Sequence, residues 1–165
     1  MRTLPIINSV SNVPSDENYL GLRSIALHSA ENGLPPPPPS HPWVSGAVVD
    51  IPSEGGFGTL VALTNNTTSL YTSVGGGWIG VGSYSPVAQA TDQLLTVLEA
   101  HLGEFWTDDN DGFPGEGFAR IHVLLPDSRR AADVPVDSFW GKAPHPLMPV
   151  IAAIQEVMTA SRPFQ

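Results

Sequence analysis

Between residues 43 and 82 the sequence repeats one pattern, in which a short run of β-forming residues is followed by a cluster of Gly, Pro, Asn or Ser. The runs cover residues 43–51, 57–64, 68–74 and 78–82. Val, Ile, Thr and Tyr suit a pleated surface, and the residues between the runs are those that form turns. The pattern therefore predicts an antiparallel meander of about four strands.

Two later segments have apolar residues at helical spacing. The first begins at Ser85, which we expect to be the N-cap, with Pro86 at the first helical position, and it ends near Gly103. The second covers residues 146–160, and a hairpin formed by 118–125 and a short partner at 130–134 lies between the two helices. We therefore predict an α+β fold, with an antiparallel sheet of meander plus hairpin and two amphipathic helices packed on it.

The first 42 residues differ from the rest. We expect residues 1–42 to form an N-terminal arm and residues 43–165 to form a single α+β domain. The segment 35–42 is a Pro-rich spacer, in which five consecutive prolines form an extended polyproline II rod. The alternative is that the prolines are a docking site for a proline-binding partner. The structure of residues 1–34 stays open.

Charge and composition exclude several classes of function. The net charge is −9 and the chain has one lysine, so binding to nucleic acid or to an anionic membrane is not expected. The chain has no cysteine, and we see neither a signal peptide nor a membrane-spanning apolar run. These features favour a cytoplasmic protein.

The stretch from Gly75 to Gly80 matches the dinucleotide-binding pattern G-x-G-x-x-G. That fingerprint needs a helix directly after the glycines, whose N–H groups hold the pyrophosphate. Here residues 78–82 are β-like and no helix begins before Ser85. We interpret the stretch as a turn between strands, in which Gly80 and Gly82 let the following helix pack closely on the sheet. The alternative is a ligand-binding loop formed by Gly75, Gly76, Gly77 and Gly80.

The segment 107–112, TDDNDG, resembles the first half of an EF-hand loop. Asp109 and Asp111 match two ligand positions, but the twelfth position, which needs a bidentate Glu, is Phe118. We therefore expect a solvated acidic loop, with calcium binding by Asp109 and Asp111 as the weaker alternative. We predict neither a metal nor a cofactor.

No catalytic set emerges. The five histidines are scattered, and His122 shares a strand face with Arg120. A carboxylate pair could form among four acidic residues, but nothing selects them: Asp50, Glu54, Glu104 and Glu116. Four tryptophans lie near turns or strand ends, where aromatic residues belong to the edge of a core or anchor an interface: Trp43, Trp78, Trp106 and Trp140.

Several short motifs occur together. They are a Thr-Leu-Val strand, a Ser-Leu-Tyr strand, a triple-Gly turn followed by Ile-Gly-x-Gly, and a His-Pro-Leu before the last helix, at Thr59–Val61, Ser69–Tyr71, Gly75–Gly77, Ile79–Gly82 and His145–Leu147. With this combination, most of the segment 44–160 resembles a family of small uncharacterised bacterial proteins. The resemblance implies a bacterial, cytoplasmic setting and carries no activity.

These observations favour a non-enzymatic protein-interaction module, such as an adaptor, an assembly subunit or an inhibitor-type partner. It would bind another protein or form a homo-oligomer. The alternative is a small-ligand-binding protein or enzyme that uses the loop from Gly75 to Gly82.

Overall fold

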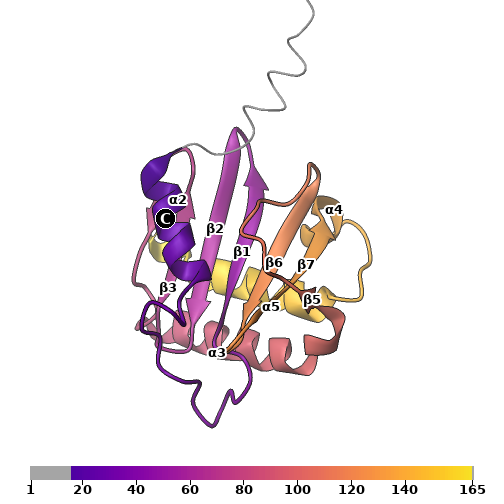
Figure 1. Ribbon diagram of the computed structural model, residues 1–165. Coiled ribbons are helices and arrows are strands. Elements are labelled where there is room, and N and C mark those ends of the chain that lie inside the picture. The colour runs from indigo at the N-terminus through magenta and orange to yellow at the C-terminus, as the bar shows by residue number, and fades with distance from the viewer. Residues whose placement is uncertain (1–15, 165) are drawn as a thin grey trace, which may run out of the picture.

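In the computed structural model, which describes residues 16–164, a seven-stranded antiparallel sheet forms the centre of the molecule (Figure 1). The strand order is β4-β3-β2-β1-β6-β7-β5. The meander consists of β1 (Gly46–Ser53), β2 (Gly56–Leu63), β3 (Thr68–Thr72) and β4 (Gly77–Trp78). The later strands are β5 (Trp106–Thr107), β6 (Phe118–Leu124) and β7 (Arg129–Pro135). The predicted α+β fold with an antiparallel sheet is confirmed, and the two-residue strand β5 is an addition to it.

Strand β1 lies at the centre because the hairpin joins the meander there. It pairs with β2 on one side and with β6 on the other, so that Val48 lies opposite His122. Side chains alternate along the strand. Ala47 and Val49 belong to the main hydrophobic core, whereas Val48 and Asp50 point to the opposite face of the sheet.

Helices α3 (Ser85–Ala100) and α5 (Met148–Ala160) cover one face of the sheet and form the main core with it (Figure 1). Helix α3 begins one residue earlier than predicted, and α5 begins two residues later. The N-cap of α3 is Tyr84 in place of the predicted Ser85, and no side chain donates or accepts a capping hydrogen bond there. The predicted start of the last helix at residue 146 falls in a turn, because the backbone N–H of Leu147 donates to the His145 ring at 3.0 Å.

The other face carries helix α2 (Glu17–Leu27), whose N-cap Asp16 accepts a hydrogen bond from the Tyr19 N–H at 2.9 Å. This helix lies within the segment expected to be an arm, but it buries Tyr19, Arg23, Ala26 and Leu27. Residues 1–15 of that arm and Gln165 lie outside the described residues. From α2 the chain runs through the prolines, outside any helix or strand, to β1.

Short elements complete the fold. They are α4 (Val136–Phe139) and two 3-10 turns, Leu102–Glu104 and Arg162–Phe164. Across residues 16–164, no helix combines the length and the apolar character needed to cross a bilayer.

The glycine stretch forms a turn between β3 and β4. Gly75, Gly76, Gly77 and Gly80 have positive φ angles, which glycine adopts at no steric cost. The strand predicted at 78–82 ends at Trp78, since the positive φ of Gly80 interrupts the extended backbone. Our reason for a glycine at position 82 was wrong: an added Cβ there would meet the carbonyl oxygen of the β2–β3 turn, not a helix.

Candidate functional site

Asp50 is the only charged residue of β1, and it is fully buried. Arg23 of α2 binds it in a bidentate manner, with Nε 3.0 Å from Oδ1 and Nη2 2.8 Å from Oδ2. From β2, the Thr59 hydroxyl donates to Oδ1 at 2.8 Å. From β6, Nε2 of His122 lies 3.0 Å from Oδ2. Three elements of the structure therefore meet at one carboxylate.

The same group of charges holds the loop between β5 and β6. Nδ1 of His122 lies 2.9 Å from Oδ2 of Asp108, and Arg129 donates to Asp108 at 3.1 Å and to Asp111 at 2.7 Å. Arg23 also donates to the backbone carbonyls of Asp111 and Gly112 at 2.6 and 3.2 Å. The loop that we expected to be solvated is instead ion-paired onto the sheet. We call Arg23, Asp50, Asp108, Asp111, His122 and Arg129 the ionic network.

The pKa values of the network follow from its hydrogen bonds. Burial by itself would raise the pKa of Asp50, but the hydrogen bonds from His122 and Arg23 outweigh burial and lower the pKa to about 2. The pKa values of Asp108 and Asp111 are lowered in the same way, against the effect of burial, by donors that include His122 for the first and His28 for the second. Because ionised carboxylates only accept hydrogen bonds, Asp50 and Asp108 act as acceptors in these contacts.

The centre of the ionic network, at Asp50 and His122, is closed to a substrate. Asp50 and His122 have no exposed surface, and the two arginines beside them are almost fully buried. Their polar atoms bind one another and the backbone of the loop, so the arrangement can fasten α2 and residues 108–112 to the sheet.

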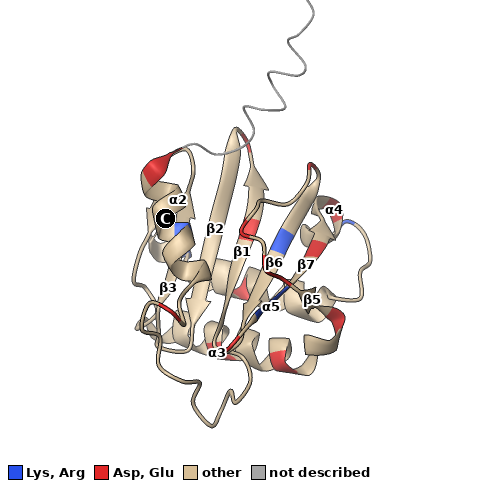
Figure 2. Ribbon diagram, in the orientation of Figure 1, with Lys and Arg blue, Asp and Glu red and all other residues tan. Residues whose placement is uncertain are grey.

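Folding also determines the charge of the surface. Three arginines, Arg23, Arg120 and Arg129, form ion pairs with four of the sixteen acidic residues: Asp50, Asp108, Asp111 and Asp133. The remaining twelve acidic side chains are exposed or half-buried. In the described part of the chain, the Arg and Lys residues outside these pairs are Arg130, Lys142 and Arg162. Figure 2 shows acidic positions spread over helices, strands and loops. The accessible surface is therefore more one-sided in charge than the composition indicates.

Asp111 and Asp109, the alternative calcium ligands, are not equivalent. The carboxylate oxygens of Asp111 contact Arg129 and His28, at 2.7 and 2.6 Å. Asp109 is exposed. Within residues 16–164, no group of three or more His, Asp or Glu side chains is arranged to hold a metal ion.

The four tryptophans separate into two kinds. Trp78 is buried in the main core, and its indole N–H has no hydrogen-bond partner among the described residues. Trp43, Trp106 and Trp140 are 66%, 50% and 47% exposed. The first kind is a core residue, and the second kind is available for an interface.

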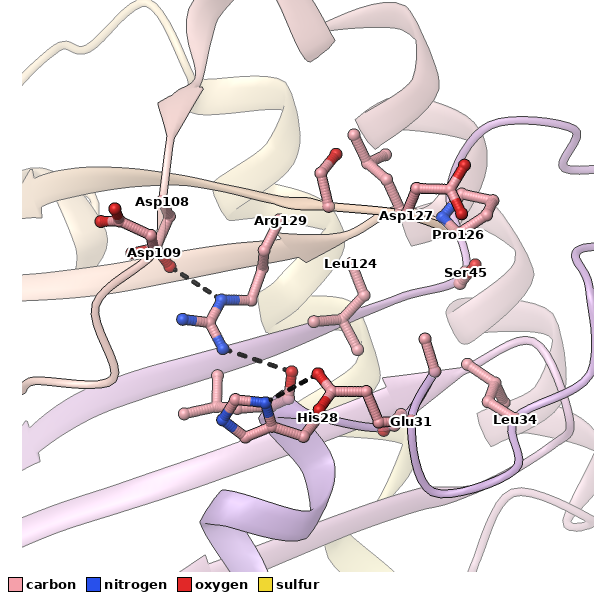
Figure 3. Close-up of a pocket in the computed structure, with 15 residues that line it drawn as sticks. His28, Glu31, Leu34, Ser45, Asp108, Asp109, Leu124, Pro126, Asp127 and Arg129 are labelled. Atoms are coloured by element: carbon pink, nitrogen blue, oxygen red, sulfur yellow. Dashed lines mark hydrogen bonds and ion pairs between the residues drawn. The ribbon is translucent and has the colours of Figure 1, made fainter.

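Two hollows lie on either side of the β6–β7 turn, residues 125–128, which lines both. The His28 hollow has a volume of about 440 Å³ and is lined by the end of α2, the turn, Asp108, Asp109 and Arg129 (Figure 3). The Trp43 hollow has a volume of about 450 Å³ and is lined by the turn with Trp43, Glu99, Leu102 and Arg130. Hydrogen bonds to Asp111 and Glu31 raise the pKa of His28, which contacts both carboxylates.

A third hollow, the glycine hollow, lies beside the turn from β3 to β4. It has a volume of about 470 Å³, and residues 75–79 line it together with Asp16, Asn18, Tyr19 and residues of β3. The structure thus brings Gly75, Gly76 and Gly77 to one concave surface. Gly80 does not line it.

The ionic network was missed at the sequence level. Asp50 was considered only as a partner for other carboxylates, and its contacts are Arg23, Thr59 and His122 instead. The available signal was a single charge inside an otherwise apolar strand, because such a charge must find a partner when the strand is central. Nothing local identified that partner.

Comparison of the chain with models of protein families, with curated proteins and with solved structures found no match.

Proposed function

We propose that this protein is a non-enzymatic protein-interaction module that binds a basic partner protein as an adaptor, an assembly subunit or an inhibitor. The observation that carries the proposal is the charge that remains on the surface after folding. In the described part of the chain, twelve acidic side chains but only three Arg or Lys side chains lie outside the ion pairs described above. Such a surface attracts a cationic partner and speeds its association. The buried centre of the ionic network supports a structural use of polar groups that would otherwise suggest catalysis.

Affinity capture from cells of the source organism tests this proposal, with the full-length tagged protein as bait and mass spectrometry as the readout. We expect one stoichiometric partner of basic isoelectric point, whose capture weakens as the salt concentration rises from about 0.05 to 0.5 M, since salt screens exposed charges. Capture of no stoichiometric partner, or of one that is insensitive to salt, would contradict the proposal.

The second candidate function is binding of a small ligand in the glycine hollow, which the concave shape and polar groups beside residues 75–79 favour. A metabolite collection screened by thermal shift provides the test, with Gly76→Ala as the variant and Gly141→Ala as the control. Both glycines have a positive φ, and neither added Cβ meets another atom within 4 Å, so the two changes cause the same kind of backbone strain. A metabolite that stabilises the wild type and Gly141→Ala, but not Gly76→Ala, would favour this function over the first.

A further inference from the structure

The backbone around Trp43 is fixed while its side chain is exposed. The N–H groups of Trp43 and Val44 both donate to Oε2 of Glu99, at 2.7 and 2.9 Å. Two residues earlier, the buried ring of His41 contacts Asp92 at 2.6 Å. Asp92 and Glu99 are seven residues apart on α3, so they lie on the same side of the helix, about two turns apart. The segment 41–44 is therefore tied to α3 at both ends.

This anchoring does not explain the exposed indole. The indole is 66% exposed, and the hydrogen bonds from the Trp43 and Val44 N–H groups to Glu99 do not involve it. Because the backbone of Trp43 is already held by Glu99, only the side chain loses conformational freedom when a partner covers it, and Trp is among the residues that contribute most to binding at interfaces. An exposed Trp on a fixed backbone is suited to anchor a partner.

The residues that line the Trp43 hollow indicate which side chains a partner would place there. Leu102, Leu125 and Pro126 give it apolar walls, and Nη1 of Arg130 is held by the Leu102 carbonyl at 2.8 Å. Asp127, at the tip of the turn, is exposed and has no ion pair among the described residues. Beyond the turn lies the His28 hollow, where Glu31 and Asp109 are also exposed. A largely apolar depression, which the cation of Arg130 also lines, thus borders an acidic rim of exposed carboxylates.

We propose that Trp43 and the Trp43 hollow form the docking surface for a protein segment in which an apolar side chain is flanked by lysine or arginine. The inference rests on the proposed function and adds the place and the chemistry of binding. The apolar side chain packs against Trp43 in the hollow, and the cationic side chains reach Asp127 and the acidic rim. A second copy of the chain fits poorly, since two strongly acidic surfaces repel each other at this site.

A display library of random twelve-residue peptides, panned against the full-length protein, tests the surface directly. Enriched peptides are then synthesised with a fluorescent label and titrated against matched pairs of variants. Trp43→Ala is compared with Ile25→Ala, which removes an apolar side chain of similar exposure from α2. Asp127→Lys is compared with Glu156→Lys, which makes the same change in net charge on α5. Circular dichroism verifies that all four variants fold.

We expect enriched peptides to combine Lys or Arg with an aromatic or aliphatic residue. Their binding should weaken about tenfold or more in Trp43→Ala and Asp127→Lys and change less than about twofold in the two controls. The proposed docking surface would be wrong if no peptide is enriched, or if the enriched peptides are acidic or uncharged. It would also be wrong if binding weakens equally in a variant and its control. If a basic partner is captured from cells and Trp43→Ala retains it, the surface is wrong while the proposed function stands. If no partner is captured, the function itself fails.

Discussion

Replacement of Arg23 by Met tests whether the ionic network holds the outer layer of the protein. The substitution keeps an unbranched apolar stem but removes both hydrogen bonds to Asp50 and both to the carbonyls of residues 111 and 112. It also removes the guanidinium that stacks 3.9 Å from the centre of the Phe113 ring. Asp50, without exposed surface, then keeps only Thr59 and His122 as donors.

Removing one partner of a buried ion pair typically costs about 3–5 kcal/mol, because the remaining charge is left without compensation. That is a large part of the roughly 5–15 kcal/mol by which a domain is stable. The free energy of unfolding is measured by urea titration, followed by tryptophan fluorescence, with the slope checked for two-state behaviour. The control is Arg120→Met, which breaks a partly exposed pair with Asp133 and should cost about 1 kcal/mol or less.

The double variant Arg23→Met/Asp50→Asn separates two causes. If the cost arises from an uncompensated buried charge, neutralising Asp50 should recover part of it, so the double variant should be more stable than the sum of the single changes implies. The reasoning would be refuted if Arg23→Met cost no more than Arg120→Met. Strict additivity would show that lost packing, not charge, explains the effect.

Three further predictions concern pH, backbone packing and the tryptophans. The pKa of Asp50 is lowered to about 2 in the folded protein, so its ionised form contributes about 2 kcal/mol to the free energy of unfolding. This contribution is fully present above the ordinary pKa of 3.8 and is lost as the pH falls through the folded-state pKa. Urea titrations between pH 6 and 2.5 should show the loss, and a free energy of unfolding that does not change with pH would contradict it. Gly82→Ala should destabilise the protein by at least about 1 kcal/mol, since its Cβ would meet a backbone carbonyl, whereas Gly103→Ala meets nothing within 4 Å; equal midpoints in thermal unfolding would count against this account. Trp78→Ala should lower the free energy of unfolding by about 3–5 kcal/mol, because Trp78 is buried, and Trp43→Ala should lower it much less, because Trp43 is exposed. Urea titrations of both variants measure the difference, and equal losses would contradict it.

Local sequence patterns were sufficient for most of the elements. The predicted runs 57–64 and 118–125 correspond closely to β2 and β6, because alternating side chains and nearby turn residues act within a few positions of the chain. Boundaries were less accurate where a specific contact decides them. The start of α5 depends on the ring of His145, and the end of β4 depends on the φ angle of Gly80.

The candidate site was accessible only in part. Trp43 was identified from its place near a strand start, but the sequence does not show that Trp43 is exposed and Trp78 buried. That difference depends on which side of the sheet each residue faces and on what covers it. The carboxylates of α3 that fix the backbone at Trp43 lie about fifty residues away in the chain, so no local spacing reveals the contact.

By itself, the sequence determined the kind and order of the longer elements from β1 onward, the acidic balance and the turn at the glycines, since each depends on neighbours in the chain. Helix α2 and the short elements β5 and α4 were not among the predicted elements. Tertiary structure alone decided that the hairpin pairs with β1 and that α2 lies on the opposite face from α3 and α5. It also decided that Arg23, Asp50 and His122 meet. The physical reason is that a buried charge requires a partner, but its partner can come from any element that the sheet brings within hydrogen-bonding distance.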